Sequence, residues 1–456
     1  MKFAFCLIAS LLAALSCADD VDDLIRKEME LRSIPGMSVL VTQDDKLVKR
    51  TAYGKADLEL DVPMTTEHVM ESGSIGKTFT AIVIFQLVEE GKLDLKDTLG
   101  KRLKDCPEPW KDLTLQMLLS HTSGLPDYAV VPGLGLIEKW EKADWFKKMP
   151  TLPFDFKPGT QFAYSNSNYW LLGFVAEEAG GKPIMALVKE RILDKLGLKQ
   201  TYIADEMAVI PKRAKGYLRA GPNLLLNGPG IAPGYGDGSL INSCEDLAAL
   251  EKGLREGKLL KPETVEKMQS ANRLPNNRKT GYGYGWFVRE INKVKLVSHG
   301  GNTAGYFASL FRVPAKNLTI VLEGNIHDVG GDAIAQRIAE LYVPELRYVK
   351  LPEAPDPDPG TTKQRLEVIR SLAARAPKDE LLDPEMTARL KTGRGQMAMG
   401  SFARFKDLAK IAFLASEPAD PDTLVKYRGE LAGKTYLFTF TITKAGKIYS
   451  VGQREE

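Results

Sequence analysis

Strand-forming segments lie on both sides of a long helix-rich stretch, and this order limits the folds that the chain can adopt. Near the start, residues 37–41 and 46–54 alternate as two strands joined by a turn. Strand patterns return between residues 294 and 324, after a middle region with helical periodicity. One antiparallel sheet assembled from both ends of this region, with helices packed on it, accounts for the order. The sequence therefore predicts an α+β or α/β fold, with helices expected at residues 78–90, 113–119 and 169–179.

A serine and a lysine stand three residues apart where the first expected helix begins. Ser74 and Lys77 lie in the stretch Glu71-Ser72-Gly73-Ser74-Ile75-Gly76-Lys77, so they share one face of the helix start. A serine hydroxyl becomes a good nucleophile when a base lies within hydrogen-bond reach, and a buried lysine can be that base. The helix N-terminus adds free N–H groups near the reacting oxygen. The pattern predicts a nucleophile, a base and half of an oxyanion hole; a capping serine beside a solvent-facing lysine is the alternative.

Nucleotide, metal and nucleic-acid chemistry find no support in the sequence. Gly76-Lys77-Thr78 resembles the end of a phosphate-binding loop, but that loop needs a glycine where this chain has Glu71, whose carboxylate would repel phosphate. The four histidines show no metal-ligand spacing. The net charge is only +3, with acids and bases interspersed, which argues against a polyelectrolyte partner. We therefore expect no cofactor, no metal and no nucleic-acid partner.

A polar segment just before the helix at residues 169–179 offers a proton-transfer group and an amide. Tyr164, held beside a lysine ammonium, could exchange protons with Ser74 and with a leaving group. Asn166 carries both a donor and an acceptor, which suits it to orient Lys77 and to hold a substrate amide or ester. A helix entry decorated with polar caps is the alternative interpretation of this segment.

A third segment has three candidates in the sequence. Lys279-Thr280-Gly281 and Lys391-Thr392-Gly393 are two copies of a triplet known from penicillin-interacting enzymes, but neither lies in an expected strand. Ser298-His299-Gly300-Gly301-Asn302 directly follows the strand expected at residues 295–297. Small residues at a strand edge allow close approach of a substrate and leave an N–H free for an oxyanion. We therefore assign substrate binding to His299, Gly301 and Asn302, with His299 as the polar or cationic group; an ordinary loop histidine is the alternative.

Three segments, in this order, resemble the β-lactamase-related serine hydrolases: class C β-lactamases, D-alanyl-D-alanine carboxypeptidases and esterases of the same fold. The matching residues are Ser74-Ile75-Gly76-Lys77, Tyr164-Ser165-Asn166 and His299-Gly300-Gly301. The resemblance covers roughly residues 34–325 and implies a penicillin-binding-protein-like antiparallel sheet with flanking helices and a helical subdomain. Flanking matches occur at residues 118–126, 236–239 and 283–286.

The resemblance also implies a role for each matched residue. Ser74 would be the acylated nucleophile, with Lys77 and Tyr164 sharing the base and acid roles. Asn166 would orient the substrate. Backbone N–H groups of Ser74 and Asn302 would form the oxyanion hole.

The chain departs from the β-lactamases at His299-Gly300-Gly301, where they have lysine, a hydroxyl residue and glycine. This departure weakens the expected recognition of a substrate carboxylate. We therefore expect an esterase-like hydrolase that acts on a small-molecule ester, peptide or β-lactam-like substrate. A D-amino-peptidase, a carboxypeptidase or a β-lactamase is the alternative. A sensor that binds a peptidoglycan-like ligand without turnover is the alternative of another class.

The N-terminus has the pattern of a secretory signal peptide. Lys2 precedes an apolar run at residues 3–15, and Ser16-Cys17-Ala18 supplies small residues for cleavage. Residues 1–18 are therefore expected to be cleaved off as a signal peptide, so that the mature protein is secreted or periplasmic. A lipid anchor at Cys17 is the alternative. No later stretch has the length and apolarity of a transmembrane helix.

A proline- and aspartate-rich stretch at residues 349–362 is expected to be a stiff linker. It would separate a hydrolase domain at residues 19–348 from a small C-terminal α+β domain at residues 363–456. In the C-terminal part, Tyr436, Phe438, Phe440 and Ile442 alternate as one face of a half-buried strand. Helices are expected there at residues 363–376 and 383–390, and strands at 410–416, 424–431, 434–443 and 447–451.

Overall fold

The structure is a computed structural model that describes residues 20–135, 141–205, 208–221, 224–228, 235–238 and 240–456. The expected signal peptide, Cys17 included, lies outside these residues. The described chain begins in a helix that ends at residue 32 and leads into the first strand. Among the described helices, none has the length and apolarity needed to cross a membrane.

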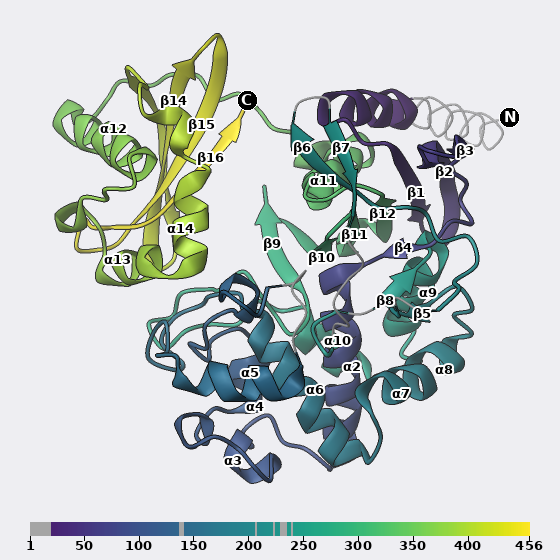
Figure 1. Cartoon of the computed structure of the whole chain (residues 1–456). Helices are drawn as coiled ribbons and strands as arrows, with labels where there is room; N and C mark the ends of the chain where they lie inside the picture. The colour runs from purple at the N-terminus through teal and green to yellow at the C-terminus, as the bar shows by residue number, and fades with distance from the viewer. Residues whose placement is uncertain (1–19, 136–140, 206–207, 222–223, 229–234, 239) are drawn as a thin grey trace, which may run out of the picture.

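A seven-stranded antiparallel sheet is built from both ends of the region, as the sequence predicts (Figure 1). Its order is β3-β2-β1-β12-β11-β10-β9, so the early strands lie beside four late strands. Leu40 in β1 faces Val321 in β12 across the junction between the two parts of the chain. The strands are β1 (Gly36–Gln43), β2 (Lys46–Asp57), β3 (Val62–Pro63), β9 (Phe287–Ile291), β10 (Val294–Thr303), β11 (Tyr306–Val313) and β12 (Leu318–Gly324).

Both faces of the sheet are covered, because side chains alternate along each strand. Leu310 and Val321 point into a core that they share with the helices α2 (Gly76–Glu89) and α6 (Asn166–Gly180). Phe311 and Ile320, their neighbours in sequence, pack into a second core with Ile334 and Ile338 of α11 (Gly331–Tyr342). Strand β10 therefore has one face toward α11 and one toward α2 and α6.

Helix α6 begins three residues earlier than the sequence pattern predicts. Ser165 precedes its first turn, and Asn166 is its first residue rather than a residue of the preceding loop. Gly181 ends the helix with a positive φ of 69°, a conformation that glycine adopts without steric cost.

The other helices of this part are α3 (Leu99–Arg102), α4 (Leu115–Leu119), α5 (Lys142–Lys148), α7 (Ile184–Val188), α8 (Asp194–Leu196), α9 (Cys244–Arg255) and α10 (Pro262–Met268). Short strands form two further sheets: β4 (Met70–Glu71), β8 (Leu240–Asn242) and β5 (Tyr202–Ile203), and β6 (Tyr217–Gly221) with β7 (Leu224–Asn227).

The large sheet carries a fully buried acidic side chain, whose hydrogen-bond partner is a thiol rather than a basic residue. Glu323 in β12 is fully buried, and the Cys244 thiol donates to its Oε2 at 3.7 Å. Burial raises the pKa of Glu323 well above its usual value, and the charge of Glu245 adds to this shift. Cys106 and Cys244, whose pairing the sequence left open, are both free thiols.

The C-terminal segment forms a four-stranded antiparallel sheet with its own buried cluster. Tyr436, Phe438 and Phe440 share one buried face, as predicted. Helix α12 begins at Pro359, inside the expected linker, because the Asp358 side chain caps its first turn. The domain boundaries themselves stay a prediction. The elements are α12 (Pro359–Ala373), α13 (Pro384–Lys391), α14 (Gly393–Gly400), β13 (Ile411–Ala419), β14 (Asp422–Leu431), β15 (Lys434–Ile442) and β16 (Ile448–Glu455).

Candidate active site

Ser74 and Lys77 lie together where a short 3₁₀ helix, η1 (Gly73–Ile75), leads into α2. The Nζ of Lys77 is 3.0 Å from the Oγ of Ser74. Lys77 is fully buried, whereas Ser74 is partly exposed. The alternative of a solvent-facing lysine is therefore wrong, and the predicted nucleophile and base are in hydrogen-bond contact.

Two further acceptors hold the amine of Lys77 in place. Its Nζ donates to Asn166 Oδ1 at 2.7 Å and to the backbone oxygen of Asp237 at 2.8 Å. An ammonium has three N–H groups, so these two acceptors and Ser74 engage all of them. In a neutral amine, two N–H groups would keep Asn166 and Asp237, and the lone pair would face the Ser74 hydroxyl. The structure thus brings Asn166 into contact with the amine of Lys77, and its role in orienting that amine stays a prediction.

Tyr164 lies beside Lys77, with its ring held between aromatic neighbours. The ring centroid is 5.2 Å from Lys77 Nζ and 4.3 Å from the centroid of the His121 ring. The ring of Phe287 stacks on it at 5.8 Å. The structure therefore brings the predicted phenol to the predicted lysine, while its part in proton transfer stays a prediction.

The edge of β10 touches the nucleophile segment at glycines. A Cβ on Gly301 would lie 1.8 Å from the Ser72 oxygen and 2.9 Å from the Ser74 nitrogen. A Cβ on Gly73, which has a φ of 51°, would lie 3.0 Å from the Asn302 nitrogen. Since β9 pairs with β10 only as far as Ser298, the edge beyond that residue is open toward η1. The two N–H groups predicted for an oxyanion hole therefore belong to segments in direct contact.

The sequence left His299 as a polar or a cationic group, and the structure supports the polar one. Its ring is fully buried, with Nδ1 2.8 Å from the Gly300 oxygen and Nε2 3.0 Å from the Tyr282 hydroxyl. Because a carbonyl only accepts, Nδ1 carries the proton, and Nε2 accepts from Tyr282. Burial, aided by the charge of Lys77, lowers the pKa of His299 to about 3. The imidazole is neutral at physiological pH, and both of its nitrogens have partners within the protein.

A side chain at position 300 would point away from the nucleophile. A Cβ at this position would lie 2.9 Å from Asp332 Oδ1 in α11, on the sheet face that points away from Ser74. Asp332 already accepts hydrogen bonds from the hydroxyls of Ser298 and Ser309, at 2.8 and 2.5 Å. A hydroxyl at position 300 would lie beside this cluster, and the effect of its absence on substrate recognition stays a prediction.

Several residues at the site carry no assignment from the sequence. Asp127 is buried and accepts hydrogen bonds from the Asn166 backbone N–H at 3.0 Å and from Arg394 Nε at 2.6 Å. The Tyr128 hydroxyl donates to Asp237 Oδ2 at 2.6 Å. The matched flanks at residues 118–126 and 236–239 pointed to this area without giving roles, and Ser239 lies outside the described residues. Nothing in the sequence indicated Arg394.

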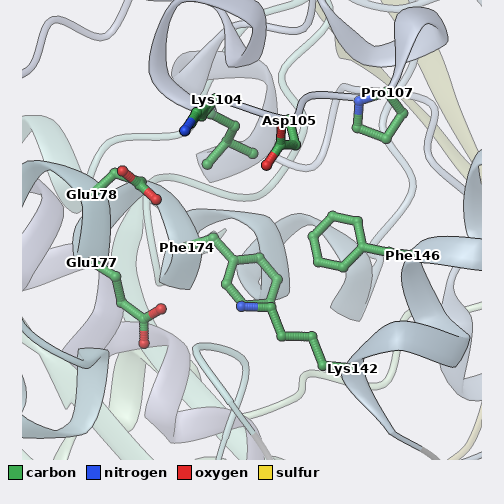
Figure 2. A pocket seen from close by; sticks show the side chains of 9 residues that line it. Lys104, Asp105, Pro107, Lys142, Phe146, Phe174, Glu177 and Glu178 are labelled. Atoms are coloured by element: carbon green, nitrogen blue, oxygen red, sulfur yellow. The ribbon is translucent and has the colours of Figure 1, made fainter.

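A separate pocket of about 440 Å³ lies at the far end of α6 (Figure 2). The Lys142 ammonium lies 3.8 Å from the ring centroid of Phe174 there. Glu177, which also lines it, follows Asn166 by three helical turns, roughly 16 Å along the axis. The pocket is therefore separate from the Ser74 site. In the part of the chain that the structure describes, no group of three or more histidine, cysteine, aspartate or glutamate side chains could hold a metal ion.

Comparisons with known proteins agree with this architecture. A family model described as Beta-lactamase matches residues 21–342. A beta-lactamase from Pseudomonas fluorescens is 27% identical over 67% of this chain and 92% of its own length. A D-aminopeptidase from Brucella anthropi is 26% identical over 67% of this chain, and the match spans 61% of that protein.

The fold also occurs in a solved structure. The octameric penicillin-binding protein homologue from Pyrococcus abyssi superposes with a TM-score of 0.64 at 22% identity, over 96% of both chains. At this identity the likeness concerns the fold alone. It confirms the predicted penicillin-binding-protein-like class.

Proposed function

Because the chain belongs to the Beta-lactamase family of serine hydrolases, we propose that it cleaves an ester or amide bond through an acyl-enzyme on Ser74. The observation that carries the proposal is the 3.0 Å contact between Lys77 Nζ and Ser74 Oγ. With Asn166 and Asp237 accepting two of its N–H groups, a neutral Lys77 would direct its lone pair at the serine hydroxyl. The hydroxyl proton would pass to this amine as Oγ attacks the acyl carbon.

The remaining steps follow from the neighbouring groups. The N–H groups of Ser74 and Asn302 would stabilise the oxyanion of the tetrahedral intermediate. As the bond to the leaving group breaks, Lys77 and Tyr164 would pass the proton to the departing oxygen or nitrogen. A water molecule would then cleave the acyl-enzyme by the same route in reverse, which releases the acid and restores Ser74.

The substrate is proposed to be an ester or an uncharged peptide-like acyl donor. A neutral, internally bonded His299 does not supply the permanent charge with which a lysine at this position would attract a carboxylate. The second candidate is a D-amino peptide or a β-lactam, which the names of two relatives favour. Initial rates with p-nitrophenyl butyrate, nitrocefin and a D-Ala-D-Ala peptide separate these candidates.

Covalent labelling tests the proposal directly. Mass spectrometry after treatment with a fluorophosphonate is expected to find one adduct on Ser74, and none in the Ser74→Ala variant. Labelling that survives in Ser74→Ala would refute the assignment of the nucleophile. An adduct on Ser74 without turnover of any substrate in the panel would instead favour the ligand-binding sensor.

The processing of the N-terminus is a separate proposal. The charged and apolar pattern at residues 2–18 supports export to a secreted or periplasmic location. Sequencing the N-terminus of the protein expressed in a bacterial host tests it, with cleavage after Ser16 or Ala18 as the expected result. An intact Met1 in the exported fraction would contradict it.

A further inference from the structure

A guanidinium from the C-terminal segment reaches the active site. Helix α14 begins against the hydrolase part: a Cβ on Gly393 would lie 2.8 Å from Val130 Cγ2. The next residue, Arg394, donates from Nε to Asp127 Oδ2 at 2.6 Å, and its Nη2 pairs with the same oxygen. Its guanidinium carbon lies 5.0 Å from the ring centroid of Tyr164, within the range of a cation–π contact.

Asp127 connects this arginine to the nucleophile. Its side chain is only 2% exposed, and it accepts from the backbone N–H of Asn166 at 3.0 Å and from Asn166 Nδ2 at 3.4 Å. Asn166 Oδ1 in turn accepts from Lys77, which contacts Ser74. A continuous series of hydrogen bonds thus runs from Arg394 to the serine. A buried carboxylate without a charged partner is costly, so loss of Arg394 would disturb Asp127 first and Asn166 next.

We propose that Arg394 is a positioning residue of this active site. Its ion pair with Asp127 fixes the side chain of Asn166, and through it the amine of Lys77 beside Ser74. Its guanidinium also packs on one side of Tyr164. The C-terminal segment is then a part of the catalytic unit. This inference rests on the proposed acyl-enzyme function, which it deepens.

A second contact makes the proposal testable, because it attaches the C-terminal segment without Arg394. Arg278 donates to both carboxylate oxygens of Asp422, at 2.7 and 3.2 Å, and the two side chains are 13% and 4% exposed. Its guanidinium also lies 4.0 Å from the ring centroid of Tyr449, and the neighbouring Asn276 donates to Glu385. An Arg394 variant should therefore keep the segment docked while it loses the contact with Asp127.

The experiment compares Arg394→Ala with Arg404→Ala in the full-length protein. Arg404 is an exposed arginine of the same segment, whose guanidinium lies 5.8 Å from its neighbour Phe405. We expect Arg394→Ala to lower kcat on p-nitrophenyl butyrate and the fluorophosphonate labelling rate by about 10- to 100-fold, the scale of a small misplacement of catalytic groups. KM should change by less than about threefold, and Arg404→Ala should match the wild type.

Two additional measurements distinguish positioning from a purely structural role. Guanidinium ion at non-denaturing concentration should restore part of the kcat of Arg394→Ala in a saturable manner, because it can occupy the site beside Asp127. Arg394→Lys should be intermediate, since an ammonium keeps the charge but not the planar guanidinium geometry. Tm should fall less in Arg394→Ala than in Arg278→Ala.

The outcomes separate the inference from the proposed function. Wild-type protein that is never labelled at Ser74 would overturn the acyl-enzyme function and this inference with it. A labelled wild type and an Arg394→Ala variant of equal labelling rate and kcat would overturn the inference alone. A lower kcat that guanidinium does not restore, with a fall in Tm as large as that of Arg278→Ala, would also overturn it.

Discussion

Replacing Gly301 by alanine should separate the edge of β10 from the nucleophile segment. The added Cβ would lie 1.8 Å from the Ser72 oxygen and 2.9 Å from the Ser74 nitrogen. An ordinary nonbonded contact is about 3.5 Å, so the two backbones would have to move apart by roughly 1.5 Å. That displacement would remove the Asn302 N–H from the oxyanion position. Loss of one such donor typically costs about 100- to 1000-fold in kcat, or about 3–4 kcal/mol.

The adjacent residue supplies a matched control. In Gly300→Ser the new side chain would meet Asp332 Oδ1 on the α11 face of the sheet, and its hydroxyl could donate to that carboxylate. Steady-state kinetics on the preferred ester should show kcat reduced at least 100-fold in Gly301→Ala and within about threefold of the wild type in Gly300→Ser, with folding of both checked by circular dichroism. A folded Gly301→Ala variant of normal kcat would refute the close-approach argument. A Gly300→Ser variant that gains nitrocefin turnover would refute the placement of that side chain.

Three further predictions concern buried residues, and the first two follow from pKa shifts. Below the unfolded-state pKa near 4.5, Glu323 is protonated in the folded and the unfolded protein, so its burial carries no charge penalty. As the pH rises above that value, the unfolded state ionises while the buried carboxyl keeps its proton, and the free energy of unfolding falls. Glu323→Gln should therefore be more stable than the wild type at pH 8, with a difference that shrinks toward pH 4, as measured by urea unfolding; equal stability at pH 8 would contradict this. Because the pKa of His299 is about 3, His299→Gln should keep the pH dependence of kcat/KM that the wild type shows between pH 5 and 8. If the variant instead lost a change of kcat/KM centred near pH 6.5, the imidazole of the wild type would titrate there and the prediction would be wrong. His299→Ala, which removes a ring buried beside Tyr164 and Tyr282, should still impair turnover far more than Lys279→Ala.

The sheet and the residues around Ser74 could be anticipated because their signals are local. Alternation over a few residues specifies a strand, and the spacing of Ser74 and Lys77 places both on one helical turn. The hairpins that carry β11 and β12 were therefore predicted within a few residues. The order of strand-like and helical stretches was enough to indicate that the first hairpin joins the last one.

The helix that carries Arg394 could not be anticipated in the same way. Glycine occupies three of the eight positions of α14, and each glycine disfavours a helix by about 1 kcal/mol relative to alanine. The helix forms nevertheless, with the Thr392 side chain capping its first turn and Met399 buried in the C-terminal core. Tertiary contacts thus decided a local structure that the sequence pattern opposed.

By itself, the sequence determined the chemistry that the site can offer: a serine, a lysine, a tyrosine and a glycine edge, each in a segment of recognisable periodicity. The tertiary structure decided the protonation state of the neighbouring His299 and the face of the sheet toward which each side chain of β10 points. His299 is neutral because neighbours from several segments exclude water from its ring, and a side chain at position 300 faces α11 because the pleat of β10 alternates. Arg394 reaches Tyr164 only through packing of the C-terminal segment. Burial and long-range proximity depend on the whole chain, so no local pattern could reveal them.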